Sequence, residues 1–252
     1  MTKLKIGIVG VGHLGSALLL GLIHSGTEKS DIIQCVRAEK VADNAEKFGV
    51  RATDDINVAA TFADVLFIAT KAAAFAELAP SIDRETLRGK TVVSLMAGVT
   101  IERIAELIGE NAEIVRAMPS LAIETLDGII GYTRCEREVA EVFETLGYAF
   151  EIAPDKLERV TAFSGCGPGF AAYILDAFSA AGQALGFTAA QADIIASRTF
   201  AAVSARGGDY RALVEAVATP GGATERGIAA LDGADVRGAL KRAVEASYDK
   251  VK

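Results

Sequence analysis

The fold of this chain is decided near its N-terminus by residues 5–23, which read KIGIVGVGHLGSALLLGLI. The first apolar residues predict a buried strand, and the mostly apolar residues 16–23 predict a helix packed on a sheet. Between them, three glycines follow the G-x-G-x-x-G spacing of a dinucleotide-binding loop. Gly10 is expected to form the tight turn, Gly12 to let a pyrophosphate approach the backbone, and Gly15 to let helix and strand pack closely.

The start of this predicted helix is the expected phosphate site. Its N–H groups are free and the helix dipole is positive there, so an anion is favoured. The expected cofactor contacts in the loop are Gly10, Gly12, His13, Leu14 and Gly15. The alternative is a glycine-rich turn without a ligand, which the flanking strand and helix disfavour.

Composition narrows the class of protein. A chain of 252 residues, 51% of them hydrophobic, can form one large domain or two modest ones. A net charge of −7 argues against a sequence-independent nucleic-acid surface. Three cysteines without a C-x-x-C pair and only two histidines predict neither a metal site nor a disulfide framework. With no secretory leader and no membrane-spanning segment expected, we predict a cytoplasmic protein.

Strands alternate with helices in the first part of the chain. Strands are expected at residues 31–36, around residue 50, and at residues 64–69, 91–96, 113–116 and Gly128–Tyr132. Helices are expected at residues 38–48, 54–61 and from residue 100. Beyond Ala153-Pro154 only helical stretches follow. The pattern predicts an α/β protein: a doubly wound, Rossmann-type sheet over residues 1–153, then an all-α domain over residues 154–252.

Several helices of the second part are predicted to be apolar nearly all round, notably over residues 171–175 and 178–182. A helix of this kind must be buried. A domain of about a hundred residues has little interior in which to bury it. We therefore expect this part to pack against a second copy of the chain, forming a homodimer or a larger oligomer.

The end of the second predicted strand indicates which cofactor is used. NAD-binding folds place an acidic residue there to bind the ribose 2′-hydroxyl. This chain has Arg37, and Glu39 falls in the next helical turn. A guanidinium can pair with a 2′-phosphate, so we expect NADPH rather than NADH, which remains the alternative. Arg37 could also be an ordinary solvated surface residue.

Other strand ends carry further candidates. Lys71 follows Ala69 and Thr70 at the carboxyl edge of a strand, where ligands bind in such sheets. It is expected to contact nicotinamide or phosphate, with a plain surface lysine as the alternative. Arg116 either faces the site or forms a strand-end salt bridge. His24, near a helix end, is expected to be structural.

Two glycine-rich runs open helices in the second part. They are residues 163–170, FSGCGPGF, and residues 218–224, ATPGGAT. Helix N-termini with small residues and hydroxyls offer free N–H donors that suit a carboxylate. Either run could be an ordinary helix start, but two of them beside a dinucleotide fold predict a substrate pocket.

This second part lacks a catalytic base. No histidine lies beyond His24, and no lysine follows the first glycine run by one helical turn. Cys166 has no local histidine to activate it as a nucleophile. The chemistry expected is hydride transfer to a carbon that needs no protein base, such as the cationic carbon of a C=N bond.

Four segments make the chain resemble the pyrroline-5-carboxylate reductase family over essentially its whole length. They are residues 93–101 (VSLMAGVTI), 116–119 (RAMP), 160–168 (VTAFSGCGP) and 219–224 (TPGGAT). The resemblance implies an NAD(P) domain followed by a helical dimerisation domain. It also implies an enzyme that reduces 1-pyrroline-5-carboxylate to L-proline with NAD(P)H, the last step of proline biosynthesis.

The resemblance also implies site residues. Further cofactor contacts are implied at Ala97, Gly98, Met118 and Pro119. Substrate contacts are implied at Ser164, Gly165, Cys166, Thr219, Gly221, Gly222, Ala223 and Thr224. The loop of residues 219–224 would hold the substrate carboxylate, and the catalytic Thr224 hydroxyl would reach towards the ring nitrogen.

The chain also departs from the family pattern. Where the family has M-P-N-T-P, this chain has Met118-Pro119-Ser120-Leu121-Ala122, and where it has K-P, this chain has Lys71-Ala72. The family's S-G-S-G-P is Ser164-Gly165-Cys166-Gly167-Pro168 here, and the A-Y that follows it is Gly169-Phe170. Each change removes a polar or rigid group, and lost hydrogen bonding alters discrimination strongly. Two alternatives therefore stay open: reduction of a different cyclic imine carboxylate, or a weakly catalytic NADPH-binding paralogue with a regulatory role.

Overall fold

The computed structural model describes residues 4–251, which divide into two compact units. The first runs through Gly165 and resumes at Tyr248, and the second is Cys166–Ser247. The predicted domain boundary between residues 153 and 154 stays a prediction. Its outer ends, residues 1–3 and 252, lie outside the described residues.

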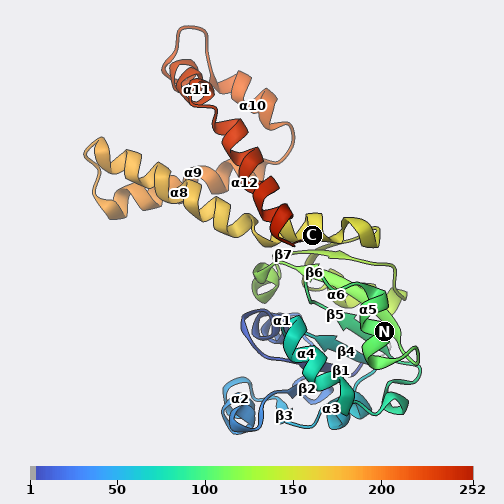
Figure 1. Cartoon of the computed structure of the whole chain (residues 1–252). Coiled ribbons are helices and arrows are strands. Elements are labelled where there is room, and N and C mark those ends of the chain that lie inside the picture. The colour runs from blue at the N-terminus through green and yellow to red at the C-terminus, as the bar shows by residue number, and fades with distance from the viewer. Residues whose placement is uncertain (1–3, 252) are drawn as a thin grey trace. The chain divides into compact units, whose positions relative to one another are not determined.

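The first unit is built on an eight-stranded sheet in the order β3-β2-β1-β4-β5-β6-β7-β8 (Figure 1). The strands are β1 (Ile6–Val9), β2 (Ile32–Cys35), β3 (Arg51–Thr53), β4 (Val65–Ile68), β5 (Thr91–Ser94), β6 (Glu113–Pro119), β7 (Gly128–Tyr132) and β8 (Gly147–Glu151). Strands β1 to β6 are all parallel, and the chain winds outward from β1 in both directions. The predicted doubly wound, Rossmann-type sheet is confirmed.

The far edge of the sheet differs from the prediction. Strand β6 continues through Met118 and Pro119 instead of ending at Arg116, because its last residues pair antiparallel with β7. Strand β8 was not predicted, and it pairs in parallel with β7. The residues of β8 are half-buried or exposed. Its sequence therefore does not need, and does not have, the continuous apolar run that marks the central strands.

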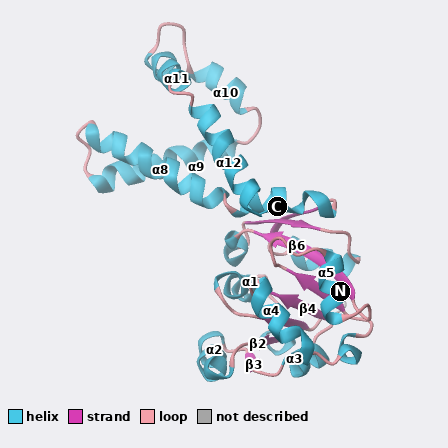
Figure 2. Ribbon diagram, in the orientation of Figure 1, coloured by secondary structure: helices cyan, strands magenta, loops and turns pink. Residues whose placement is uncertain are grey.

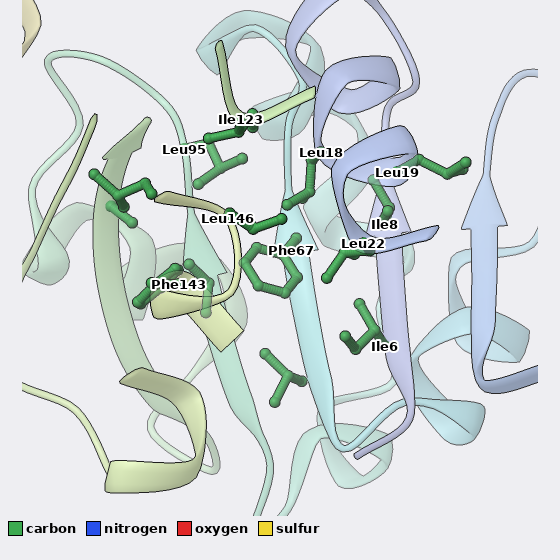
Figure 3. Close-up of a cluster of buried hydrophobic side chains, with 14 of the residues drawn as sticks. Ile6, Ile8, Leu18, Leu19, Leu22, Phe67, Leu95, Ile123, Phe143 and Leu146 are labelled. Atoms are coloured by element: carbon green, nitrogen blue, oxygen red, sulfur yellow. The ribbon is translucent and has the colours of Figure 1, made fainter. Parts of the chain in front are cut away.

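Both faces of the central strands are buried, because successive side chains point to opposite sides of a sheet. In β4, Val65 and Phe67 join one apolar cluster and Leu66 and Ile68 join the other. Figure 3 shows the first cluster, with Leu18 and Leu22 of α1 close to Phe67. Burying one such side chain fully contributes roughly 1.5–3 kcal/mol.

Helices cover the two faces of the sheet. The helices and helical turns of the first unit are α1 (His13–His24), η1 (Lys29–Asp31), η2 (Ala38–Lys40), α2 (Val41–Phe48), α3 (Ile56–Phe62), α4 (Ala72–Leu78), η3 (Ala79–Ser81), η4 (Arg84–Leu87), α5 (Ile101–Ile108), η5 (Leu121–Thr125), α6 (Arg137–Glu144), η6 (Pro154–Lys156), α7 (Leu157–Val160) and η7 (Thr161–Gly165). Helices α1 and α6 contribute to the cluster of Figure 3, and α3, α4 and α5 to the other.

The second unit is helical (Figure 2). It contains α8 (Gly167–Ala184), α9 (Ala189–Arg206), α10 (Tyr210–Val217), α11 (Ala223–Gly233) and most of α12 (Val236–Val251). Between Glu151 and the end of the described residues there is no strand, as predicted. Helix α9 begins with a capping box in which Thr188 and Gln191 bind each other's backbone N–H.

Helices α8 and α9 leave large apolar side chains exposed. Tyr173 is 77% exposed, Phe178 47% and Ile194 63%. The buried residues of the two helices are small: Ser179, Ala192 and Ala196. Within residues 4–251, no helix has the length and apolar character needed to cross a membrane.

Gly21 tests the packing of α1 against η5. A Cβ at this position would clash with the carbonyl oxygen of Ile123 and lie 2.9 Å from Leu146 Cδ2. We expect Gly21→Ala to lower the free energy of unfolding by about 2 kcal/mol, because the η5 backbone must move. Urea unfolding followed by circular dichroism measures it.

The matched control is Gly227→Ala in α11, where a Cβ would meet no atom within 4 Å. Alanine is the better helix former, so this variant should gain roughly 0.5–1 kcal/mol. Equal stability of the two variants would contradict the described contact between α1 and η5.

Candidate functional site

The first group of predicted site residues surrounds the turn between β1 and α1. Gly10 has a φ of +89°, and a Cβ there would lie 2.6 Å from Thr70 Cγ2. A Cβ on Gly15 would clash with the Gly10 carbonyl oxygen. Gly12 differs, because a Cβ there would meet no atom within 4 Å. The protein itself requires glycine at two of these positions, and the third leaves open space.

That open space adjoins free hydrogen-bond donors. Gly12 is the N-cap of α1 and provides no side-chain cap, and the first turn carries no acidic residue. The N–H groups of His13, Leu14 and Gly15 therefore have no intrahelical acceptor. The buried Thr70 hydroxyl, beside Gly10, has no hydrogen-bond partner within residues 4–251. These features fit the phosphates of a dinucleotide.

Arg37 follows β2 at the carboxyl edge of the sheet. Its Nε lies 3.2 Å from Glu39 Oε1, and both side chains are largely exposed. An exposed pair of this kind is worth at most about 1 kcal/mol, so the guanidinium can turn to another anion. In β2 itself, burial and the nearby Asp55 raise the pKa of Cys35 to about 11, so this thiol stays protonated at neutral pH.

The remaining predicted cofactor residues lie at the carboxyl ends of β4, β5 and β6. After β4 come the half-buried Ala69 and Thr70 and the exposed Lys71, which is the N-cap of α4. After β5, Ala97 and Gly98 are exposed. At the end of β6, the side chain of Met118 is buried with Leu157 and Val160, and Pro119 is half-buried.

A pocket of about 390 Å³ opens beside the ends of β5 and β6. It is lined by Gly98, Thr100, Ile101, Glu102, Arg116, Pro154, Asp155, Glu158 and Tyr248. Hydrogen bonds from the backbone N–H of Glu102 and from Thr100 hold the pKa of the Glu102 carboxyl below its usual range. Sequence reasoning singled out Gly98 and Arg116 but missed the acidic residues of the lining.

Arg116 is the buried charge of this pocket, with 2% of its surface exposed. Its Nη2 donates to Glu158 Oε1 at 2.6 Å and lies 3.5 Å from the Met96 carbonyl oxygen. Its Nε is buried without a hydrogen-bond partner in the described part of the chain. The structure thus gives Arg116 an ion pair and also a place in the pocket wall.

The ion pair joins β6 to the segment that leads to the first glycine-rich run, residues 163–170. Glu158 lies on α7, which continues into η7, a π-helical turn containing Ser164 and Gly165. The Ser164 hydroxyl donates to the Val160 carbonyl oxygen at 2.8 Å. Single π-helical turns are rare and often mark functional sites. Glu158 left no signal in the sequence, because its partner is 42 residues away.

The remaining predicted substrate residues belong to the second unit. Cys166 is half-buried at the N-cap of α8, with Pro168 in the first turn as predicted. The loop of residues 219–224 precedes and opens α11, whose N-cap is Gly222. Thr219, Gly221, Ala223 and Thr224 are exposed. The predicted site residues are thus divided between the two units.

Two other expectations concern groups away from these loops. The Nδ1 of His24 lies 2.7 Å from the Glu124 carbonyl oxygen, a structural contact between α1 and η5. Across residues 4–251, no cluster of three or more His, Cys, Asp or Glu side chains is arranged to hold a metal ion.

The ion pair between Arg116 and Glu158 can be tested through stability. Removing one partner leaves a buried charge uncompensated, so Glu158→Ala should lower the free energy of unfolding by about 3 kcal/mol. The double variant Arg116→Met with Glu158→Leu removes both charges and should be clearly more stable than Glu158→Ala. Urea unfolding of the wild-type protein and of these two variants measures the differences in the free energy of unfolding. A double variant no more stable than Glu158→Ala would contradict a buried, uncompensated cation.

Comparison with known proteins agrees with this architecture. Residues 154–252 match the family model for pyrroline-5-carboxylate reductase dimerisation. Residues 5–98 match the family model for NADP oxidoreductase, coenzyme F420-dependent. Pyrroline-5-carboxylate reductase of Escherichia coli is 29% identical, covering 98% of this chain and 96% of its own. Pyrroline-5-carboxylate reductase 2 of Bacillus subtilis is 28% identical, covering 96% and 91%.

Solved structures show the same fold. The Plasmodium falciparum pyrroline carboxylate reductase with NADP bound aligns with a TM-score of 0.90 at 23% identity, covering 100% of this chain and 98% of its own. The pyrroline-5-carboxylate reductase of Coxiella burnetii aligns with a TM-score of 0.88 at 25% identity, covering 99% and 98%. Over its whole length, the chain is thus similar in fold and in sequence to pyrroline-5-carboxylate reductases.

Proposed function

We propose that this protein is an NADPH-dependent oxidoreductase that reduces 1-pyrroline-5-carboxylate to L-proline in proline biosynthesis. The observation that carries the proposal is the free N-terminus of α1, with its open position at Gly12. In the same chain, glycine-rich loops open α8 and α11. Relatives that match nearly the whole chain are named pyrroline-5-carboxylate reductases.

The dinucleotide would be held mainly by backbone. The N–H groups of His13, Leu14 and Gly15 and the Thr70 hydroxyl would bind the phosphates, with Lys71 beside them. Arg37 would bind the 2′-phosphate in a charge-assisted pair. The strand ends with Ala97, Gly98, Met118 and Pro119 would border the nicotinamide. When bound, NADPH supplies the hydride.

The substrate would be held by the loops that open α8 and α11. Ser164, Gly165 and Cys166 form the first, and Thr219 with Gly221, Gly222 and Ala223 would bind the carboxylate. In the reduction the ring carbon of the C=N bond gains the hydride, and the nitrogen keeps the proton that it took from water. Thr224 would orient the ring through its nitrogen, so no side chain has to act as a base.

The second unit would pair with a second copy of the chain. The matching family model is described as dimerisation, and α8 and α9 expose Tyr173, Phe178 and Ile194. Covering such side chains contributes roughly 25 cal/mol per Å² of apolar surface. We place the domain boundary at residues 153 and 154, where this match begins, and the protein in the cytoplasm. Its net charge of −7 argues against a sequence-independent nucleic-acid surface.

The function is tested by NADPH oxidation with 1-pyrroline-5-carboxylate, with Thr224 as the probe. Thr224→Ala should lower kcat/KM about 10²-fold, because a group that orients the reacting bond is lost. The affinity for NADPH should be unchanged, and Thr224→Ser, which keeps the hydroxyl, should recover most of the activity. A fully active Thr224→Ala variant would refute the role given to this residue.

The same assay separates the alternatives. Turnover of a six-membered cyclic imine carboxylate in preference to the five-membered ring would move the substrate while keeping the reaction. Tight NADPH binding without turnover of either imine would indicate a regulatory paralogue. The comparison of imines is needed because Leu121 and Ala122 stand where the family pattern has Thr and Pro, and lost hydrogen bonding can change which substrate is accepted.

Arg37 is tested through cofactor preference. Arg37→Asp should lower kcat/KM with NADPH about 10²-fold, because it replaces an attractive charge with a repulsive one, and should leave NADH nearly unchanged. Arg134→Asp is the control. Arg134 is exposed and follows β7, and because β7 is antiparallel to β6, this residue lies at the edge of the sheet opposite to the carboxyl edge where Arg37 lies. An unchanged NADPH preference in Arg37→Asp would count against the assignment.

A further inference from the structure

The loop that opens α11 already holds a carboxylate that belongs to the chain itself. Glu225 lies in the first turn of α11, and its Oε2 accepts a hydrogen bond from the Gly221 N–H at 2.6 Å. A short contact to an ionised acceptor is among the stronger hydrogen bonds in proteins. Glu225 is exposed, and no ion pair of its carboxylate occurs within residues 4–251.

This contact occupies an N–H donor that would otherwise be open to another anion at the start of α11. The Gly222 N–H already donates to the Thr219 carbonyl oxygen at 2.9 Å. With Gly221 bound to Glu225, the donors left at this end are the first N–H groups of the helix. A second carboxylate placed there would lie beside the first one, and the two would repel each other.

By contrast, the N-terminus of α1 carries no acidic residue in its first turn. The two helix starts are built alike, with a glycine N-cap and no side-chain cap, but only α11 brings its own anion. A tethered group acts at an effective concentration in the millimolar range, enough to compete with a substrate of ordinary affinity.

We propose that Glu225 is a specificity-determining residue whose carboxylate competes with the substrate carboxylate for the start of α11. The competition raises the KM for a carboxylated cyclic imine and leaves the same ring without a carboxylate unaffected. This rests on the proposed function of the loop. A purely structural role, in which Glu225 organises the loop as a helix cap, has the opposite consequence: its loss would weaken substrate binding.

The experiment is steady-state NADPH oxidation by the full chain with 1-pyrroline-5-carboxylate and with 1-pyrroline. The variants are Glu225→Gln, which keeps a hydrogen-bond acceptor without charge, and Glu225→Ala, which frees the Gly221 N–H. We expect both to lower the KM for 1-pyrroline-5-carboxylate roughly 5-fold or more at low ionic strength, with the gap narrowing as salt is added. The KM values for 1-pyrroline and NADPH should stay within about 2-fold.

Glu215→Gln is the matched control, because Glu215 is exposed on α10 and the substitution changes the net charge equally. Circular dichroism verifies folding, and if Glu225→Ala is unstable the Gln variant alone decides. A KM for the carboxylated imine that is unchanged, raised, or shifted equally by Glu215→Gln overturns the competition.

Failure of the proposed function looks different. Wild-type protein that turns over 1-pyrroline-5-carboxylate while the Glu225 variants show no lower KM refutes the competition alone. Wild-type protein that is inactive with this imine while Glu225→Gln is active supports the competition. Inactivity of every chain with 1-pyrroline-5-carboxylate overturns the proposed function and the competition together.

Discussion

The contact on which the first unit depends is the close approach of α1 to the end of β1. Gly15 packs directly against the Gly10 carbonyl oxygen, and the space between them is too small for even a Cβ atom. This contact sets the start of α1 over the carboxyl edge of the sheet and lets Leu18 and Leu22 reach the core. Strand β1 lies between β2 and β4 and is parallel to both. The start of α1 therefore lies beside the carboxyl ends of these two neighbouring strands.

The candidate site relies on backbone donors more than on side chains. Helix starts supply N–H groups at α1 and α11, and neither has a side-chain cap. Three charged side chains near these residues bind other parts of the chain: Arg116 and Glu158 join β6 to α7, and Glu225 accepts a hydrogen bond from the Gly221 N–H. Such a site suits a reaction whose electrophile is already activated, because it has to orient and exclude water more than it has to move protons.

Much of the fold could be predicted from local sequence, and the exceptions share a cause. Strands β1, β4 and β5 are short apolar runs buried on both faces, so their composition alone marks them. The extension of β6 and the whole of β8 depend on pairing with β7, which no local pattern encodes. The same holds for the site: the glycine loops were visible, whereas the partner of Arg116 is 42 residues distant and became apparent only in the folded chain.

The open space beside Gly12 has a consequence for how this protein tolerates mutation. At Gly10 and Gly15 a side chain would collide with the protein's own backbone or side chains, so we expect a replacement there to impair folding. At Gly12 nothing in the polypeptide resists a methyl group, and an alanine there would yield abundant, soluble, well-folded molecules. Selection on that residue can act only through the ligand. A survey that scores cellular abundance separately from growth without proline would therefore divide the three glycines of this loop into two classes. Replacements of Gly10 and Gly15 would lower abundance, whereas replacement of Gly12 would lower growth alone, which identifies the position that faces the ligand.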